Sequence, residues 1–162
     1  MIAVIALGSN QGDRLVFLKT ALREIKNLDN TSILRKSKIY QTQPEGGVAE
    51  HAFLNAVIEI ETKLSATELL KALQQIEVNN QRVRMIKWGN RTLDLDLIDY
   101  NQEILASAEL ILPHPLAHQR AFVLLPWLEI NPGAVLPKLG PIKDIVQINE
   151  FGELEFYSEF EE

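Results

Sequence analysis

The sequence contains no cysteine, so it can form neither a disulfide nor a thiolate nucleophile. Its first residues, MIAVIALGSN, lack the basic start and the small-residue cleavage site of a signal peptide, and this apolar run is too short to span a bilayer. Internal repeats and an interdomain linker are also missing. These absences predict a single domain over residues 1–162 that is cytoplasmic and not bound to a membrane.

Basic residues are missing from the last thirteen positions, which explains the formal net charge of −6. This acidic tail, residues 150–162, holds six glutamates, whereas the other 16 acidic residues equal the 16 Lys and Arg residues of the body. A formally neutral body does not repel an anionic nucleotide. It also lacks the broad basic surface of a nucleic-acid-binding protein, so we expect no nucleic-acid partner.

Hydrophobic periodicity predicts the order strand–helix–strand–strand–helix–strand between residues 2 and 100. Ile2–Leu7 is an unbroken apolar run, as in a central strand buried on both faces. The other predicted strands are Thr31–Tyr40, Phe53–Thr62 and Thr92–Tyr100. This order indicates a ferredoxin-like α+β fold, an antiparallel sheet with helices packed on one face and the other face open to ligands. The residues that follow would form C-terminal additions.

Capping residues and helical spacing locate the helices. Asp13 is a plausible N-cap of the first helix, and Ser65 opens the second with the capping box S-A-T-E. Gln74 and Glu77 lie on one stripe of the second helix, so their side chains can face one site. Ala117–Leu125 is predicted to be a third helix that the following proline kinks or interrupts.

The stretch Arg82–Asp99, RVRMIKWGNRTLDLDLID, combines a basic loop with two aspartates spaced one residue apart. In a strand, Asp94 and Asp96 point to the same face with their Cα atoms about 6.5–7 Å apart. Carboxylates at this spacing can bind Mg²⁺ that carries a polyphosphate. Alternating Asp and Leu also fits a solvated amphipathic strand, but the four cations and Trp88 upstream favour a site.

The same stretch resembles the signature of the 6-hydroxymethyl-7,8-dihydropterin pyrophosphokinase family, through WGNRTLDLD at residues 88–96. Further motifs follow the family's order and spacing over roughly residues 1–130: Gly8-Ser9-Asn10, Phe53-Leu54-Asn55-Ala56, Gln74 with Glu77, Pro113-His114-Pro115 and Arg120-Ala121-Phe122. The resemblance implies an ATP-dependent enzyme of folate biosynthesis. It would transfer the terminal pyrophosphate of ATP to the hydroxymethyl group of a pterin, releasing AMP.

The resemblance also implies roles for individual residues. The catalytic residues would be Arg82, Arg91, Asp94 and Asp96, with the two aspartates holding two Mg²⁺ ions. Trp88 and Phe122 would enclose the flat pterin, and Asn55 would bind its edge. The full pterin-binding set would be Thr42, Pro44, Glu45, Phe53, Asn55, Trp88 and Phe122. The nucleotide-binding set would be Gln74, Glu77, Arg82, Arg84, Arg91, Ile98, His114 and Arg120.

Three positions depart from the family pattern. Asn90 stands where proline or a small residue is usual, and Glu109 and Leu116 stand where many members carry arginine. The last two remove cations near the nucleotide.

A nucleotidyltransferase-like enzyme with two metal ions and a non-catalytic ferredoxin-like binding module are the alternative functions. The leading interpretation predicts a monomer whose partners are ATP and hydroxymethyl-dihydropterin.

Overall fold

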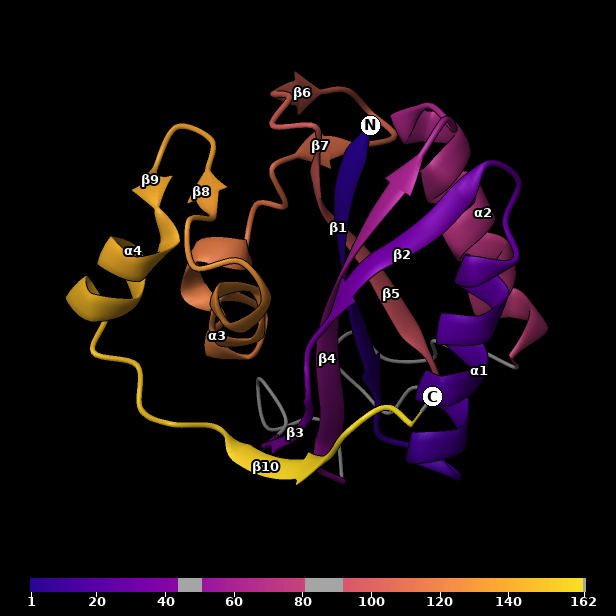
Figure 1. Cartoon of the computed structure of the whole chain (residues 1–162), viewed down its shortest axis with the longest axis horizontal. Coiled ribbons are helices and arrows are strands. Elements are labelled where there is room, and N and C mark those ends of the chain that lie inside the picture. The colour runs from indigo at the N-terminus through magenta and orange to yellow at the C-terminus, as the bar shows by residue number, and fades with distance from the viewer. Residues whose placement is uncertain (44–50, 81–91, 162) are drawn as a thin grey trace.

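A central antiparallel sheet organises the computed structural model of the chain (Figure 1). The residues that the structure describes are 1–43, 51–80 and 92–161. β1 (Ile2–Ser9) lies between β4 (Phe53–Thr62) and β5 (Asp94–Tyr100). β2 (Thr31–Lys36) pairs with the other edge of β4. The resulting order β5-β1-β4-β2 is that of a ferredoxin-like sheet and confirms the predicted α+β class.

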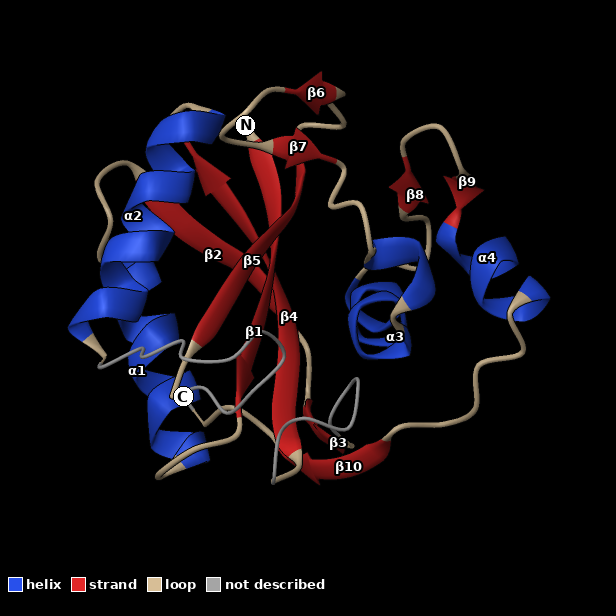
Figure 2. Cartoon of the chain, turned by 180° about the vertical axis from the view of Figure 1, so that it is seen from behind, coloured by secondary structure: helices blue, strands red, loops and turns tan. Residues whose placement is uncertain are grey.

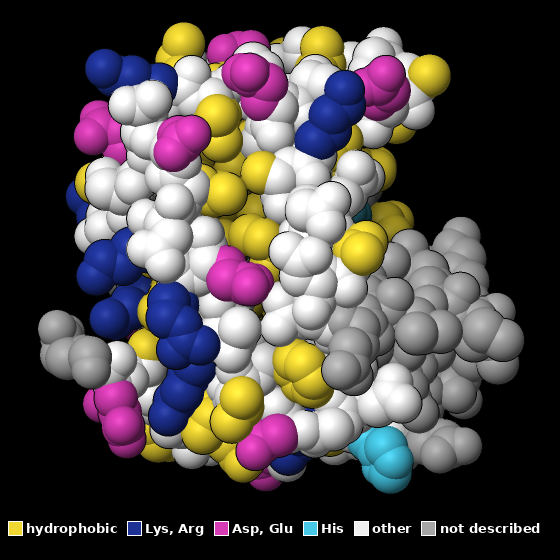
Figure 3. Space-filling view, turned by 90° about the vertical axis from the view of Figure 1, so that its right-hand side faces the viewer, with side chains coloured by type: hydrophobic (Ala, Val, Ile, Leu, Met, Phe, Trp, Pro, Cys, Tyr) yellow, Lys and Arg dark blue, Asp and Glu magenta, His cyan; other side chains and the backbone are white. Residues whose placement is uncertain are grey.

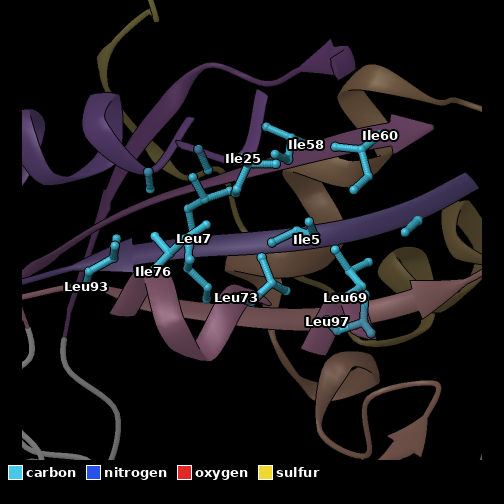
Figure 4. Close-up of a cluster of buried hydrophobic side chains, with 14 of the residues drawn as sticks. Ile5, Leu7, Ile25, Ile58, Ile60, Leu69, Leu73, Ile76, Leu93 and Leu97 are labelled. Atoms are coloured by element: carbon cyan, nitrogen blue, oxygen red, sulfur yellow. The ribbon is translucent and has the colours of Figure 1, made fainter. Parts of the chain in front are cut away.

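Two helices cover one face of this sheet (Figure 1). α1 (Arg14–Lys26) begins at Asp13, whose side chain accepts a hydrogen bond from the backbone of Val16, as predicted. α2 (Ala66–Asn79) begins at the complete capping box of Ser65. Apolar side chains from both helices pack against the sheet and form the main core (Figure 4). This core includes Ile5, Leu7, Ile25, Ile58, Ile60, Leu69, Leu73, Ile76, Leu93 and Leu97.

The second face of the sheet is also covered, so the prediction of an open face is wrong for most of its area. α3 (Ala121–Ile130) packs against β4, and α4 (Ile142–Ile148) packs against α3 (Figure 2). Val57 and Ile98 are 0% exposed within a second core that α3 completes. An apolar helix from the C-terminal additions therefore buries sheet residues that strand alternation alone leaves on the solvent side.

The predicted strand Thr31–Tyr40 is two strands, because the chain breaks after Lys36 and resumes as β3 (Ile39–Thr42). Both strands pair with β4. At the break, the Ser37 N–H donates to the Val57 carbonyl at 2.9 Å, and the Ser37 hydroxyl accepts from the Val57 N–H at 2.9 Å. The hydroxyl takes the place of a backbone acceptor, so the irregularity leaves no Val57 backbone group unpaired.

The C-terminal additions also contain several short elements. They are β6 (Leu105–Ala106), β7 (Ile111–Leu112), a 3-10 helix (Ala117–Gln119), β8 (Val135–Leu136), β9 (Gly140–Pro141) and β10 (Glu155–Ser158). The predicted helix at 117–125 is divided at Arg120, and α3 continues through Pro126 instead of ending there. Burial of Val123, Leu124 and Trp127 outweighs the one hydrogen bond that the proline removes. Within the described parts of the chain, no helix has both the length and the apolarity needed to cross a membrane.

Candidate active site

The acid pair lies at the beginning of β5. This strand starts at Asp94, two residues later than the predicted Thr92, and the predicted alternation holds. Asp94 and Asp96 are half-exposed, while the leucines that alternate with them are buried in the main core. Asp94 is paired in register with Gly8 of β1, so the pair lies beside the end of the central strand.

The acid pair forms part of the wall of a hollow, which we call the aromatic pocket. Its lining residues are Ala6, Leu7, Gly8, Thr42, Gln43, Phe53, Asn55, Asp94, Asp96, Arg120 and Phe122. The fold thus brings together four residues predicted to bind pterin: Thr42, Phe53, Asn55 and Phe122. They come from β3, β4 and the first turn of α3, and two of them supply aromatic rings.

Asn55 and Gly8 form one wall of the aromatic pocket. The Asn55 side chain is 5% exposed, and its amide nitrogen donates to the Thr42 hydroxyl. Its carbonyl oxygen lies over Gly8, where an added Cβ would be 3.0 Å away. Glycine therefore leaves the space that the Asn55 amide occupies. Gly8 was not predicted as a site residue, although the Gly8-Ser9-Asn10 motif was a signal for it.

Arg120 connects the acid pair to the aromatic wall. Its side chain is 7% exposed, and its Nη1 lies 3.7 Å from Asp96 Oδ2. Its guanidinium carbon also lies 5.4 Å from the centre of the Phe122 ring. Arg120 gains this place because the chain leaves the 3-10 helix in an extended conformation and enters α3 directly after it. A buried cation beside Asp96 is well placed to bind a phosphate oxygen.

A second hollow, the edge cleft, opens along the outer edge of β5. It is lined by Leu70, Leu95, Asp96, Leu97, Ala108, Glu109, Leu110, Ile111, His114 and Pro115. Its lining is mostly apolar and includes three ionisable side chains, Asp96, Glu109 and His114. Asp96 lines both the edge cleft and the aromatic pocket. The two hollows therefore share one carboxylate.

His114 is held in the edge cleft by backbone contacts. Its N–H donates to the Ile98 carbonyl at 2.9 Å, and its ring Nδ1 accepts from the Leu116 N–H at 3.2 Å. Burial, and to a smaller extent the positive charge of Arg120, lower the pKa of His114 to about 4. The negative charge of Asp94 acts in the opposite direction. At neutral pH the ring is uncharged, and its proton is on Nε2 because Nδ1 is an acceptor.

Three other described residues predicted on the nucleotide side, Gln74, Glu77 and Ile98, differ in their surroundings. Gln74 is exposed, whereas Glu77 is 7% exposed and its Oε2 accepts from the Leu95 N–H at 2.7 Å. Glu77 thus reaches the outer edge of β5, the strand that lines the edge cleft, and the shared role of the two side chains stays a prediction. Ile98 is fully buried in the second core.

The departures from the family pattern differ in their positions. Glu109 lines the edge cleft, while Leu116 is half-buried beside His114 and does not line it. Six predicted site residues lie outside the described residues: Pro44, Glu45, Arg82, Arg84, Trp88 and Arg91. Asn90 also lies outside them.

The donor set of the acid pair fits Mg²⁺, which prefers hard oxygen ligands. Both carboxylates are half-exposed and line the aromatic pocket. In the described ranges, no group of three or more His, Cys, Asp or Glu residues is arranged to hold a metal ion.

A ferredoxin-like sheet that carries an acid pair between an aromatic pocket and a second cleft is the framework of an α+β transferase. A family model described as "7,8-dihydro-6-hydroxymethylpterin-pyrophosphokinase (HPPK)" matches residues 4–132. The chain belongs to this family and is a pyrophosphokinase.

Curated relatives support this assignment, and a solved structure shares the fold. The 2-amino-4-hydroxy-6-hydroxymethyldihydropteridine pyrophosphokinase of Haemophilus influenzae is 42% identical over 145 residues, which are 90% of this chain and 91% of the relative. The Bacillus subtilis protein of the same name is 43% identical over 129 residues, 80% of this chain and 77% of the relative. A crystal structure of Plasmodium falciparum HPPK-DHPS with pterin and p-hydroxybenzoate matches 91% of this chain with a TM-score of 0.71. The match covers 41% of that structure at 14% identity, so it shows the fold alone.

Proposed function

We propose that this chain transfers the terminal pyrophosphate of ATP to 6-hydroxymethyl-7,8-dihydropterin in folate biosynthesis. The observation that carries the proposal is the position of Asp96, which lines both hollows. Transfer between two substrates requires the acceptor hydroxyl and the donor phosphorus to meet in line. A carboxylate common to both hollows supports a meeting point beside Asp96. Membership of the family supports the identity of the two substrates.

The chemistry of each hollow supports one substrate. A pterin is a flat heterocycle with hydrogen-bonding edges, which suits the rings of Phe53 and Phe122 and the polar groups of Thr42 and Asn55. ATP would lie in the edge cleft, with its base against the apolar wall and its phosphates toward His114.

Asp94 and Asp96 would hold the two Mg²⁺ ions, which when bound would neutralise polyphosphate charge and acidify the pterin hydroxyl. The hydroxyl oxygen forms a bond to the β-phosphorus of ATP, and the bond from that phosphorus to the α–β bridging oxygen breaks. AMP leaves and the hydroxyl proton passes to solvent. Arg120 and the Nε2–H of His114 donate hydrogen bonds to phosphate oxygens during this step. The same contribution from Arg82, Arg84 and Arg91 stays a prediction, as do the cytoplasmic location and the monomeric state.

Incubation with ATP, Mg²⁺ and 6-hydroxymethyl-7,8-dihydropterin tests this function. We expect AMP and the pterin diphosphate. Release of inorganic pyrophosphate would instead support the nucleotidyltransferase alternative, and binding without turnover would support the non-catalytic module. The Asp96→Asn protein, which keeps the shape of the side chain, is the control for contaminating kinases, and a reaction with a chelator tests the need for a divalent cation.

A further inference from the structure

We propose that Arg14 is a positioning residue for the aromatic pocket, which it supports from the opposite face of the sheet. We also propose that the acidic tail holds Arg14 in this position. The pocket lies at the end of the β3–β4 pair, which contains only the register pairs Tyr40↔Asn55, Gln41↔Leu54 and Thr42↔Phe53. So short a pairing is marginally stable unless other contacts support it. The role in pterin binding rests on the function proposed above.

Arg14, the first residue of α1, joins the two strands at this end. Its Nη1 donates to the Ala52 carbonyl at 2.9 Å and to Gln41 Oε1 at 3.2 Å. Gln41 directly precedes Thr42, and Ala52 directly precedes Phe53. One guanidinium therefore ties together the immediate neighbours of two paired pocket residues.

Arg14 acts from the opposite side of the sheet and does not line the pocket. Gln41 is paired with Leu54, which is buried in the main core under α1 and α2. Thr42 and Asn55 point to the other face, where they line the pocket. Arg14 can therefore influence a ligand only through the strands that it holds.

The acidic tail determines how Gln41 is oriented. Glu155 of β10 pairs in register with Gln41, and its Oε2 accepts from Gln41 Nε2 at 2.7 Å. A carboxylate can only accept and a guanidinium can only donate hydrogen bonds. The amide therefore satisfies both neighbours in one orientation, with its nitrogen toward Glu155 and its oxygen toward Arg14. In this way the tail supports the contact between Arg14 and β3.

Two further contacts fasten the tail beside Arg14. The ring centre of Tyr157 lies 5.6 Å from the Arg14 guanidinium carbon. Phe160 is 8% exposed and packs into the main core, and Glu161 lies 4.0 Å from Lys19 of α1. The tail is thus anchored at two places: β10 pairs with β3, and the ring of Phe160, further along the chain, is buried in the main core.

Steady-state kinetics of Arg14→Met test the proposal, because methionine keeps an apolar stem and removes the guanidinium. Loss of a hydrogen-bonding charge predicts a rise of about tenfold in the KM for the pterin. We expect kcat and the KM for ATP to stay within about twofold, because Arg14 touches neither the acid pair nor the edge cleft. Arg14→Lys should restore only part of the loss, since a point charge does not reproduce the planar fork.

Matched variants separate this role from a general effect of charge. Arg23→Met removes another α1 arginine, whose side chain contacts Thr20 in the same helix, and should change nothing. Glu155→Gln should raise the KM for the pterin by about threefold, because a neutral amide accepts a weaker hydrogen bond from Gln41 than the carboxylate does. Glu153→Gln removes an exposed carboxylate of the same tail and should be neutral.

Amide hydrogen exchange gives a readout that does not depend on turnover. Arg14→Met and Glu155→Gln should speed exchange in Ile39–Thr42 and leave β1 and β5 unchanged. Unchanged exchange would overturn the proposal, as would faster exchange with an unchanged KM for the pterin. An equal rise in both KM values with a lower melting temperature would mean a general structural effect and would also reject it. If the wild type forms no AMP, the proposed function fails, while exchange still tests whether Arg14 holds β3.

Discussion

At the scale of single residues, the site depends on which neighbouring groups each side chain meets. Asp94 and Asp96 point the same way because strand residues alternate, yet Asp96 alone of the pair lines both hollows. His114 is neutral because burial and Arg120 oppose its protonation. Gly8 contributes by having no side chain, which leaves the adjacent space to Asn55.

Replacement of either aspartate by alanine should abolish turnover and preserve the fold. Both side chains are half-buried on the pocket wall, so the variants should stay folded, although Asp96→Ala should cost more free energy of unfolding than Asp94→Ala because Asp96 lies beside the buried Arg120. Loss of a metal ligand removes several kcal/mol of transition-state stabilisation, which lowers kcat by at least about a hundredfold. Kinetics and urea unfolding measure the two quantities, with Asp144→Ala on α4 as the control. A kcat within about tenfold of wild type would exclude the metal-binding role.

Gly8→Ala should weaken pterin binding without a comparable effect on ATP. The new Cβ would lie 3.0 Å from Asn55 Oδ1, so the amide must shift by a few tenths of an ångström. Such a shift should cost about 1 kcal/mol, or roughly fivefold in the dissociation constant. Fluorescence titration with a pterin measures this change. Gly152→Ala, where a Cβ meets no atom within 4 Å, is the matched control, and equal effects of the two variants would contradict the expectation.

At the scale of elements, the C-terminal additions complete the molecule in two places. α3 closes the second face of the sheet, and Glu129 at its end accepts hydrogen bonds from the Lys38 N–H and the Tyr40 hydroxyl. β10 adds a strand to the outer side of β3. Both elements therefore hold β3, the shortest strand that contributes to the aromatic pocket.

Phe160→Ala should show that the acidic tail is part of the fold. The Phe160 ring is 8% exposed in the main core, and removing a buried ring costs about 2–4 kcal/mol. Phe156→Ala, on the same tail but 57% exposed, should cost less than about 1 kcal/mol. Urea unfolding measures both free energies. Equal, small losses would mean that the tail contributes little to stability.

At the scale of the whole molecule, charge is unevenly distributed. Figure 3 shows Lys and Arg side chains gathered along one side of the face formed by α1 and α2. The cations Lys19, Arg23, Lys26, Arg35 and Lys36 line a groove between α1 and β2, which also contains Phe160 and Glu161. The edge cleft carries the opposite sign within the described residues, because Asp96 and Glu109 line it. The charges of these described residues do not favour an anionic nucleotide at the cleft.

Glu109→Arg should tighten the binding of an ATP analogue several-fold. The change replaces a carboxylate in the edge cleft by a cation, and an exposed charge contributes up to about 1 kcal/mol. Turnover should hardly change, because Glu109 is not in the acid pair. Titration at low and high salt provides the control, since screening should remove most of the gain. Equal affinities at low salt would mean that Glu109 does not approach the phosphates.

Asp99→Asn should stabilise the protein at pH 7 by about 1 kcal/mol. Asp99 is 3% exposed, and this burial raises the pKa of its carboxyl. The nearby charges of Glu59 and Glu103 also raise the pKa, whereas the hydrogen bond from Gln102 lowers it. Because the pKa of Asp99 is raised in the folded protein, its protonated form is the one that favours folding. This form is lost as pH rises through the folded pKa. The advantage of the asparagine should therefore shrink on acidification. Urea unfolding at pH 7 and at lower pH tests this, with Asp144→Asn as the control, and a constant difference would contradict it.

Features that depend on near neighbours in the chain could be predicted without the structure. Strand alternation placed Asp94 and Asp96 on one face, side-chain capping located the starts of α1 and α2, and the order of elements indicated the ferredoxin-like sheet. The motifs around the acid pair also indicated the family. Each of these signals depends on spacing over a few residues, where backbone geometry leaves few alternatives.

Features that depend on distant partners required the fold. The break after Lys36 depends on Val57, 20 residues beyond Ser37, and the inward turn of Glu77 depends on Leu95, 18 residues away. Gln41 meets Glu155 across 114 residues, so no local pattern could indicate that the acidic tail pairs with β3. Local periodicity contains no information about such partners, because it records which face a residue occupies and not what covers that face.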